Sequence, residues 1–394
     1  MTQVQHSGSE HRVHVAIIGA GIGGLATAVA LSKAGLHVEV FEQVRRFKRV
    51  GAGLQLAPNA TAALHGLGLL TAVRATASRP TAWRSYDAHT GTVTREESLG
   101  DDIARRYGTP YLHIHRGDLH DVLADAARAV CTVHRGRRLT GLTMAGEQVH
   151  LSFEDGGRAH ADAVIGADGI HSTVRGVIFG GTRPRFSGMV AYRGLIPRER
   201  IDRLGVGPEA AKWWGEDRHL VHYWVSGGAE LNYVAPIPAT EWTEESWTAA
   251  GSIADLVAAL DDFVPQVGWL VAQTGALMRS ALYDRDPLLR WTADRVTLLG
   301  DAAHPMLPFM AQGSAMALED AAVLSRCLQG VAADELPAAL TRYERARIAR
   351  TGAIQAGSRA NTFLRSARAG TKSLTVQEVY AYDPWRVPLS GATS

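Results

Sequence analysis

A glycine-rich segment near the start of the chain has the residue types that bind a pyrophosphate. Gly19, Gly21 and Gly24 form a G-x-G-x-x-G pattern between an apolar, β-branched run at 13–18 and a helix-compatible run, and Glu42 ends the next apolar run. The first glycine permits a tight turn, the second lets the backbone approach the anion, and the third lets the helix pack on the strand, while the acid accepts from a ribose hydroxyl. The pattern predicts a βαβ unit that binds a dinucleotide. A glycine-rich turn without a ligand is the alternative.

Two later segments place an aspartate at the end of an apolar strand. The strand within 161–175 breaks at Asp168, and the strand within 295–304 leads to Asp301 at the start of the helix with the sequence GSAMALEDAAVLSRCL. An aspartate beside a helix N-terminus can bind a ribose or ribityl hydroxyl, although each could instead be a plain helix cap. Together with the glycine-rich segment they predict three bends that converge on one extended cofactor.

Composition excludes several other classes of function. The chain has 394 residues, about enough for two domains, and its formal net charge of +2 argues against an electrostatic nucleic-acid binder. Its two cysteines are too few for a disulfide framework, and its histidines lack the spacing of metal ligands. We therefore expect no metal and a cytoplasmic location. No apolar stretch is long enough for a membrane-spanning helix, and the polar first residues do not resemble a secretory signal.

The segments GAGIGG, GADGIHSTVR and LLGDAAHPMLPFMAQG together resemble the single-component flavin-dependent aromatic monooxygenases, the group of p-hydroxybenzoate hydroxylase. The resemblance covers residues 13 to about 365 and is greatest for 6-hydroxynicotinate 3-monooxygenases, followed by salicylate and 3-hydroxybenzoate hydroxylases. It implies a bound FAD and a flavin C4a-hydroperoxide that hydroxylates a phenolic or pyridine carboxylic acid, with or without loss of the carboxylate. It also implies O2 and a transient NADH or NADPH. No second G-x-G-x-x-G occurs in the sequence, which agrees with a nicotinamide that only visits.

The resemblance implies an α/β fold with a Rossmann-type βαβ FAD-binding domain and an inserted, mainly antiparallel β substrate domain. The predicted FAD-binding domain comprises 1–78, 103–178 and 280–360, the substrate domain 79–102 and 179–279, and the C-terminal tail 361–394. Short alternating runs within 186–238 independently favour an antiparallel sheet. A packed sheet that binds no ligand is the alternative.

His219 and Tyr223 are the predicted catalytic pair. They match the histidine and tyrosine that line the substrate site of the hydroxynicotinate enzymes, and residues four apart on a strand face the same side. Together they would accept the proton of the substrate hydroxyl, which makes the ring more nucleophilic. His222 should face the other way. For His219 the alternative is a hydrogen-bonded core histidine.

The predicted substrate pocket departs from the hydroxynicotinate pattern. Gln55 and Phe309 stand where those enzymes carry histidine, and Ala210 stands where they carry cysteine; Met306 is a further pocket residue. The pocket should therefore be more apolar, and a benzenoid acid or substituted phenol fits it as well as a pyridine.

The resemblance also implies several cofactor contacts. Arg116 matches a flavin-contacting arginine, Pro305 lies on the loop that passes the isoalloxazine, and Gly313 begins a helix whose N–H groups support negative charge on the flavin. Arg49 is either a cofactor contact or a surface residue. Two other functions stay open: a non-catalytic flavoprotein, and a monooxygenase of larger polyketide or antibiotic rings. The sequence does not distinguish a monomer from a homodimer.

Overall fold

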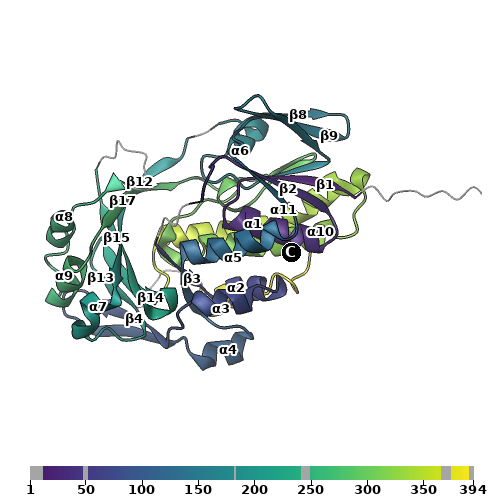
Figure 1. Cartoon of the computed structure of the whole chain (residues 1–394). Coiled ribbons are helices and arrows are strands. Elements are labelled where there is room, and N and C mark those ends of the chain that lie inside the picture. The colour runs from purple at the N-terminus through teal and green to yellow at the C-terminus, as the bar shows by residue number, and fades with distance from the viewer. Residues whose placement is uncertain (1–11, 48–51, 182, 241–248, 365–373, 390–394) are drawn as a thin grey trace, which may run out of the picture.

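The computed structural model describes residues 12–47, 52–181, 183–240, 249–364 and 374–389. Figure 1 shows a body of strands and helices on one side and a large sheet flanked by short helices on the other. The predicted α/β class, with a βαβ unit and a mainly antiparallel sheet, is confirmed.

The first body is built on a six-stranded sheet in the order β18-β19-β11-β1-β2-β7. Its strands are β1 (His14–Ile18), β2 (His37–Glu42), β7 (Thr132–Arg135), β11 (Ala163–Gly166), β18 (Thr292–Ala293) and β19 (Val296–Leu298). All neighbours pair in parallel except β18 and β19. The central strands are apolar along their length because both faces of the sheet are covered.

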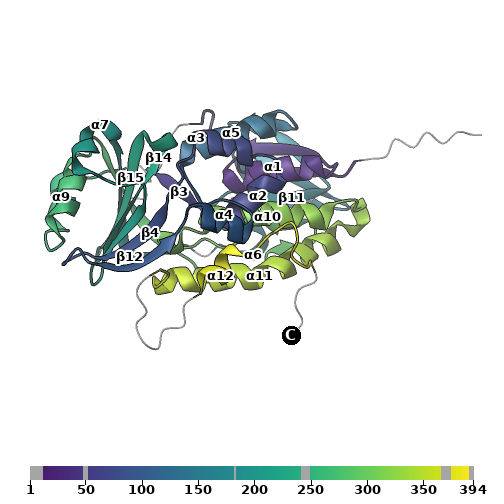
Figure 2. The same ribbon diagram turned by 90° about the horizontal axis from the view of Figure 1, so that it is seen from below.

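Helices cover one face of the parallel sheet, and a small sheet covers the other (Figure 1). The helices are α1 (Ile22–Lys33), α5 (Arg116–Arg128) and α10 (Gly313–Leu328), and the small sheet comprises β8 (Leu139–Ala145), β9 (Gln148–Phe153) and β10 (Arg158–Ala161). Further elements of this side are α2 (Pro58–Gly66), α3 (Leu70–Thr76), α4 (Asp101–Tyr107), α6 (Thr173–Phe179), α11 (Leu336–Ala360), α12 (Val376–Tyr380) and the strand pair β3 (Gly53–Leu56) and β6 (Leu112–His115). Figure 2 shows α12 beside α11.

The second body is an eight-stranded sheet in the order β16-β17-β12-β15-β14-β13-β4-β5. Its strands are β4 (Ala82–Asp87), β5 (Val93–Ser98), β12 (Arg185–Pro197), β13 (Ala210–Trp214), β14 (His219–Val225), β15 (Glu230–Pro238), β16 (Ala249–Ala250) and β17 (Leu277–Asp284). Only β13 and β4 pair in parallel. Segment 79–102 thus adds two strands to this sheet, and β17 crosses the predicted boundary at 279/280. The division into domains stays a prediction.

Short helices pack on the outer face of the eight-stranded sheet, so its inner face is turned toward the first body. These helices are α7 (Arg198–Ile201), α8 (Ile253–Ala258) and α9 (Pro265–Ala272). Leu256 and Val267 of α8 and α9 share a buried apolar cluster with Leu220 and Leu231 of the sheet. The inner face carries the residues at odd positions of β14, including His219 and Tyr223.

One expectation about local structure is wrong. Asp301 does not begin the long helix; it lies in a short 3-10 helix, η3 (Gly300–Ala302), and α10 starts at Gly313. Pro305 and Pro308 occupy the intervening segment. Because proline has no backbone N–H to donate to the preceding turn, one continuous helix cannot form there.

Candidate active site

The three predicted bends lie at one edge of the parallel sheet. Ile18 of β1 pairs with Gly166 of β11, which pairs with Leu298 of β19. The ladder continues past the strand ends, since the N–H of Ala167 donates to the carbonyl of Ile18 at 2.8 Å and that of Leu299 to Gly166 at 2.9 Å. The bends therefore leave the carboxyl ends of three adjacent strands, which is where open α/β sheets bind ligands.

The glycines of the first bend differ in what surrounds them. Gly19 has φ +103°, and a Cβ atom there would lie 2.4 Å from the carbonyl oxygen of Ala167; a Cβ on Gly24 would lie 2.0 Å from the carbonyl oxygen of Gly19. These two positions need glycine for close packing. A Cβ on Gly21, just before α1, would meet no atom within 4 Å. The space over the helix N-terminus is thus open to an anionic group.

Two of the predicted cofactor acids already accept hydrogen bonds from the backbone. Glu42 accepts from the N–H of Ala20 at 2.7 Å and from that of Val44 at 2.8 Å, which places its carboxylate against the glycine-rich turn. Asp168 accepts from the N–H of Thr173 at 2.7 Å at the start of α6. Its contacts are those of a helix cap, the alternative left open by the sequence, so its role toward a cofactor stays a prediction.

Asp301 differs because its side chain is exposed and the described residues give its carboxylate no hydrogen bond. Burial among protein atoms raises the pKa of Asp301, while His304 and Arg116 lower it. The Asp301 side chain therefore keeps solvent-accessible surface although protein atoms surround it closely. Arg116, the first residue of α5, is also exposed. The glycine turn at Gly19–Gly24, which we call the glycine cradle, leaves space for a pyrophosphate. Asp301 can accept hydrogen bonds from the hydroxyls of FAD, and Arg116 supplies a positive charge nearby, so these residues fit the cofactor.

A buried ionic network holds the Asp301 turn in place. Asp320 of α10 accepts from the N–H of Gly300 at 3.0 Å, from His304 Nε2 at 2.6 Å and from Arg347 Nε at 2.7 Å. Arg347 of α11 also donates to Glu319 at 2.7 Å. Burial opposes ionisation of Asp320, yet His304 and Arg347 lower its pKa to about 2. Sequence reasoning missed this network, although an acid pair in an apolar helix was a visible signal.

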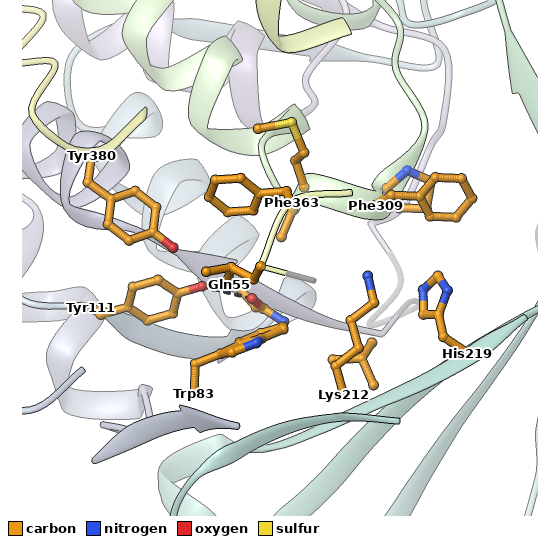
Figure 3. A pocket seen from close by; sticks show the side chains of 13 residues that line it. Gln55, Trp83, Tyr111, Lys212, His219, Phe309, Phe363 and Tyr380 are labelled. Carbon is orange, nitrogen blue, oxygen red and sulfur yellow. Dashed lines mark hydrogen bonds between the residues drawn. The ribbon is translucent and has the colours of Figure 1, made fainter. Parts of the chain in front are cut away.

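A recess lies between the inner face of the eight-stranded sheet and the segment after η3 (Figure 3). It contains about 390 Å³ of space free of protein atoms, part of it open to solvent. Its polar lining residues are Gln55, Tyr111, Lys212, His219 and Tyr380. The other lining residues are apolar or aromatic, among them Trp83, Phe309 and Phe363.

The structure brings some of the predicted pocket residues together but not all. Gln55, Phe309 and His219 line the recess, whereas Ala210 and Met306 are not among its described lining residues. Ala210 is fully buried on β13, and Met306 lies beside Gly313, the first residue of α10.

Pro305, a further predicted cofactor contact, lies on the segment between η3 and α10. The carbonyl of Pro305 accepts from Gln355 Nε2 at 2.9 Å, which fixes the loop before the recess. Arg49 lies outside the described residues.

His219 and Tyr223 share the inner face because β14 pairs with β13 without a register shift. The His219 ring meets the ring of Phe309 edge-on at 5.5 Å. Tyr223 lies behind the recess wall, with its ring 4.4 Å from that of His113. Burial raises the pKa of Tyr223, and a hydrogen bond with Gln55 opposes the rise.

His222 lies at the even position of β14 between His219 and Tyr223, and its side chain faces away from the recess, as predicted. Burial lowers the pKa of His222 to about 4, so its ring is neutral in the core.

Tyr111, Tyr380 and Lys212 are lining residues that sequence reasoning missed. For Lys212 a signal existed, because a short turn between Trp214 and His219 pairs these residues and places Lys212 on their face. Tyr380 had no local signal. Tyr111 donates its hydroxyl hydrogen to Gln55 Oε1 at 2.7 Å.

Residues 12–358 match the FAD binding domain family. The chain belongs to the FAD-binding monooxygenases. It is 37% identical over 378 residues to 6-hydroxynicotinate 3-monooxygenase of Pseudomonas fluorescens. The aligned region covers 95% of this chain and 96% of the relative. The structure of Klebsiella pneumoniae HpxO complexed with FAD and uric acid matches with a TM-score of 0.80 at 29% identity, over 89% of this chain and 87% of that one. A salicylate hydroxylase substrate complex matches with a TM-score of 0.80 at 27% identity over 97% of each chain.

The predicted enzyme class and cofactor are thereby confirmed: the monooxygenase binds FAD. Among its described helices none is both long and apolar enough to cross a membrane. Nor do the described His, Cys, Asp and Glu residues form a group of three or more that could hold a metal ion.

Asp301→Ala should weaken FAD binding about 10- to 100-fold, because a hydrogen bond to a charged group contributes roughly 1.5–3 kcal/mol. The ratio of flavin to protein absorbance after gel filtration and equilibrium titration of the apoprotein with FAD would measure this. Asp125→Ala, which removes an exposed acid from α5, is the control. A fully flavinated Asp301→Ala protein with unchanged affinity would remove Asp301 from the cofactor site.

Proposed function

We propose that this monooxygenase hydroxylates a single-ring aromatic or pyridine carboxylic acid that already carries a hydroxyl, using O2 and NADH or NADPH. The observation that carries the proposal is His219, a proton acceptor on the wall of a largely aromatic recess. Ligand pockets are lined mainly by apolar and aromatic side chains with a few polar groups, and the recess has this composition.

His219 would accept the proton of the substrate hydroxyl. The resulting phenolate is more electron-rich at its ortho and para carbons, which is what oxygen transfer to a ring requires. Bound FAD supplies the activation of O2. Trp83, Phe309 and Phe363 would hold the ring by stacking and keep water out of the recess.

The amide of Gln55 and the buried hydroxyls of Tyr111 and Tyr223 would hold the wall of the recess in a fixed conformation. Gln55 accepts a hydrogen bond from the Tyr111 hydroxyl, and a hydrogen bond between Gln55 and Tyr223 opposes the rise in the pKa of Tyr223. Tyr223 would therefore act through Gln55 rather than by direct contact, since four strand residues span about 13 Å. Glu42, Asp301 and Arg116, together with the glycine cradle, would hold FAD.

A substrate screen tests the proposed function. Salicylate, 3-hydroxybenzoate, 4-hydroxybenzoate and 6-hydroxynicotinate would each be added to the FAD-loaded enzyme, with NADH or NADPH oxidation, O2 uptake and product mass measured. At least one acid should accelerate NAD(P)H oxidation and give a hydroxylated product, and the mass shows whether the carboxylate is lost. A flavin-loaded enzyme that no such acid stimulates would contradict the proposal.

We also propose the predicted division into domains, a cytoplasmic location and a monomeric or homodimeric state. Free Cys131 and Cys327 agree with a reducing compartment. Size-exclusion chromatography with light scattering measures the oligomeric state.

A further inference from the structure

The wall of the recess is electrostatically one-sided. Among its described lining residues, Lys212 is the only one with a permanent charge, and none is an aspartate, a glutamate or an arginine. Lys212 itself is only 3% exposed. A positive charge in a region of low dielectric attracts an anion more strongly than the same charge in water. The recess should therefore select negatively charged ligands.

The fold fixes where this charge is presented. Lys212 of β13 is paired with Val221 of β14, and its neighbour on the same face, Trp214, is paired with His219. Directly paired residues of an antiparallel ladder point to the same side. Figure 3 shows the Lys212 amine and the His219 ring both directed into the recess. The Trp214 ring contacts both groups, with its centroid 3.8 Å from Lys212 Nζ and 5.2 Å from the centroid of the His219 ring. One small ring with two oxygen substituents can reach both groups.

The surroundings of Lys212 hold its amine in this place. The Nζ atom lies 3.8 Å from the centroid of the Trp214 ring and 3.5 Å from Asn361 Oδ1. The ring face and the amide oxygen orient the ammonium group. The amine is thus positioned before any ligand enters, which reduces the entropy lost on binding.

We propose that Lys212 binds the carboxylate of the substrate and is the residue that makes the enzyme prefer ring acids over neutral phenols. The inference rests on the proposed function and deepens it. With the carboxylate on Lys212 and the hydroxyl at His219, the two contacts fix which carbon of the ring faces the flavin.

Arg193 and Arg95 are two further cations on the inner face, and neither is among the described lining residues of the recess. Arg193 lies on β12, donates to Ser280 and is close to Tyr223. Arg95 lies on β5 and forms an ion pair with Glu97 at 2.7 Å.

A comparison of each acid with its amide tests the inference in the full-length, FAD-loaded enzyme. The probes are the most active acid of the screen and its carboxamide, which keeps the ring and hydroxyl but lacks the charge. Lys212→Met keeps the unbranched apolar stem, and Lys212→Arg keeps the charge. Arg84→Met, on the outer face of β4 where Arg84 pairs with Glu96 and Glu209, is the control for net charge. The dissociation constant is read from the change in flavin absorbance, and kcat and KM are measured alongside.

Lys212→Met should weaken binding of the acid by about 10- to 100-fold and leave binding of the amide unchanged. Lys212→Arg should restore much of the acid preference, and Arg84→Met should behave as the wild type. Equal losses for acid and amide, or no loss for the acid, would overturn the role of Lys212. If Lys212→Met does not retain FAD, Lys212→Gln gives the same comparison. A wild-type enzyme that no acid stimulates would instead overturn the proposed function, so the two failures are distinguishable.

Discussion

Replacing Arg347 by methionine should destabilise the protein by about 3–5 kcal/mol, the usual cost of leaving a buried charge without its partner. Arg347 is fully buried and donates to both Asp320 and Glu319. Without Arg347, the buried carboxylates of Glu319 and Asp320 would lose a positive charge that balances their negative charges. Urea unfolding followed by circular dichroism would measure the loss. Because Asp320 also binds the N–H of Gly300, the variant should lose FAD more readily as well.

Two further variants separate the charge from the loss of packing. Arg345→Met changes an exposed arginine on the same helix and should have little effect on stability. Arg347→Lys keeps a positive charge but loses the planar fork that serves two carboxylates, and should fall between methionine and the wild type. Equal stability of Arg347→Met and Arg345→Met would contradict our inference that the network supports the Asp301 turn.

The cofactor side of the site could be predicted because its signals are local. A strand, a turn of glycines, a helix and a second strand follow one another within 13–42, and each step has its own residue preference. The parallel order of the sheet then brings Asp168 and Asp301 to the same edge. The sequence could not show that Asp168 is occupied as a helix cap, since that depends on where α6 begins.

The substrate side was less predictable because its residues come from distant segments. Tyr380 lies on α12, in the predicted tail, and reaches the recess from a segment without any motif. Its position is fixed by tertiary contacts such as the hydrogen bond from Arg350 of α11 to the carbonyl of Val379. By contrast, the inner face of β14 followed from alternation alone, and the β13–β14 turn would have extended that prediction to Lys212.

His219→Ala should slow hydroxylation by about 10²- to 10⁴-fold, the usual contribution of a general base. FAD binding should stay intact, because His219 lies on β14 and the predicted cofactor residues lie at the edge of the parallel sheet. Oxidation of NAD(P)H should continue and release hydrogen peroxide, since a ring that keeps its hydroxyl proton reacts slowly with activated oxygen. The ratio of hydroxylated product to NAD(P)H consumed, together with a peroxide assay, would measure this uncoupling.

The neighbouring histidine gives a matched control for His219. His222 is buried on the opposite face of the same strand and is neutral, with its pKa lowered to about 4, so His222→Leu removes an imidazole from β14 without touching the recess. Its coupling ratio should remain that of the wild type. Raising the pH should also rescue His219→Ala in part, because the substrate hydroxyl then ionises without help, and it should not alter His222→Leu. Fully coupled turnover in His219→Ala at neutral pH would show that proton removal there is the work of another group.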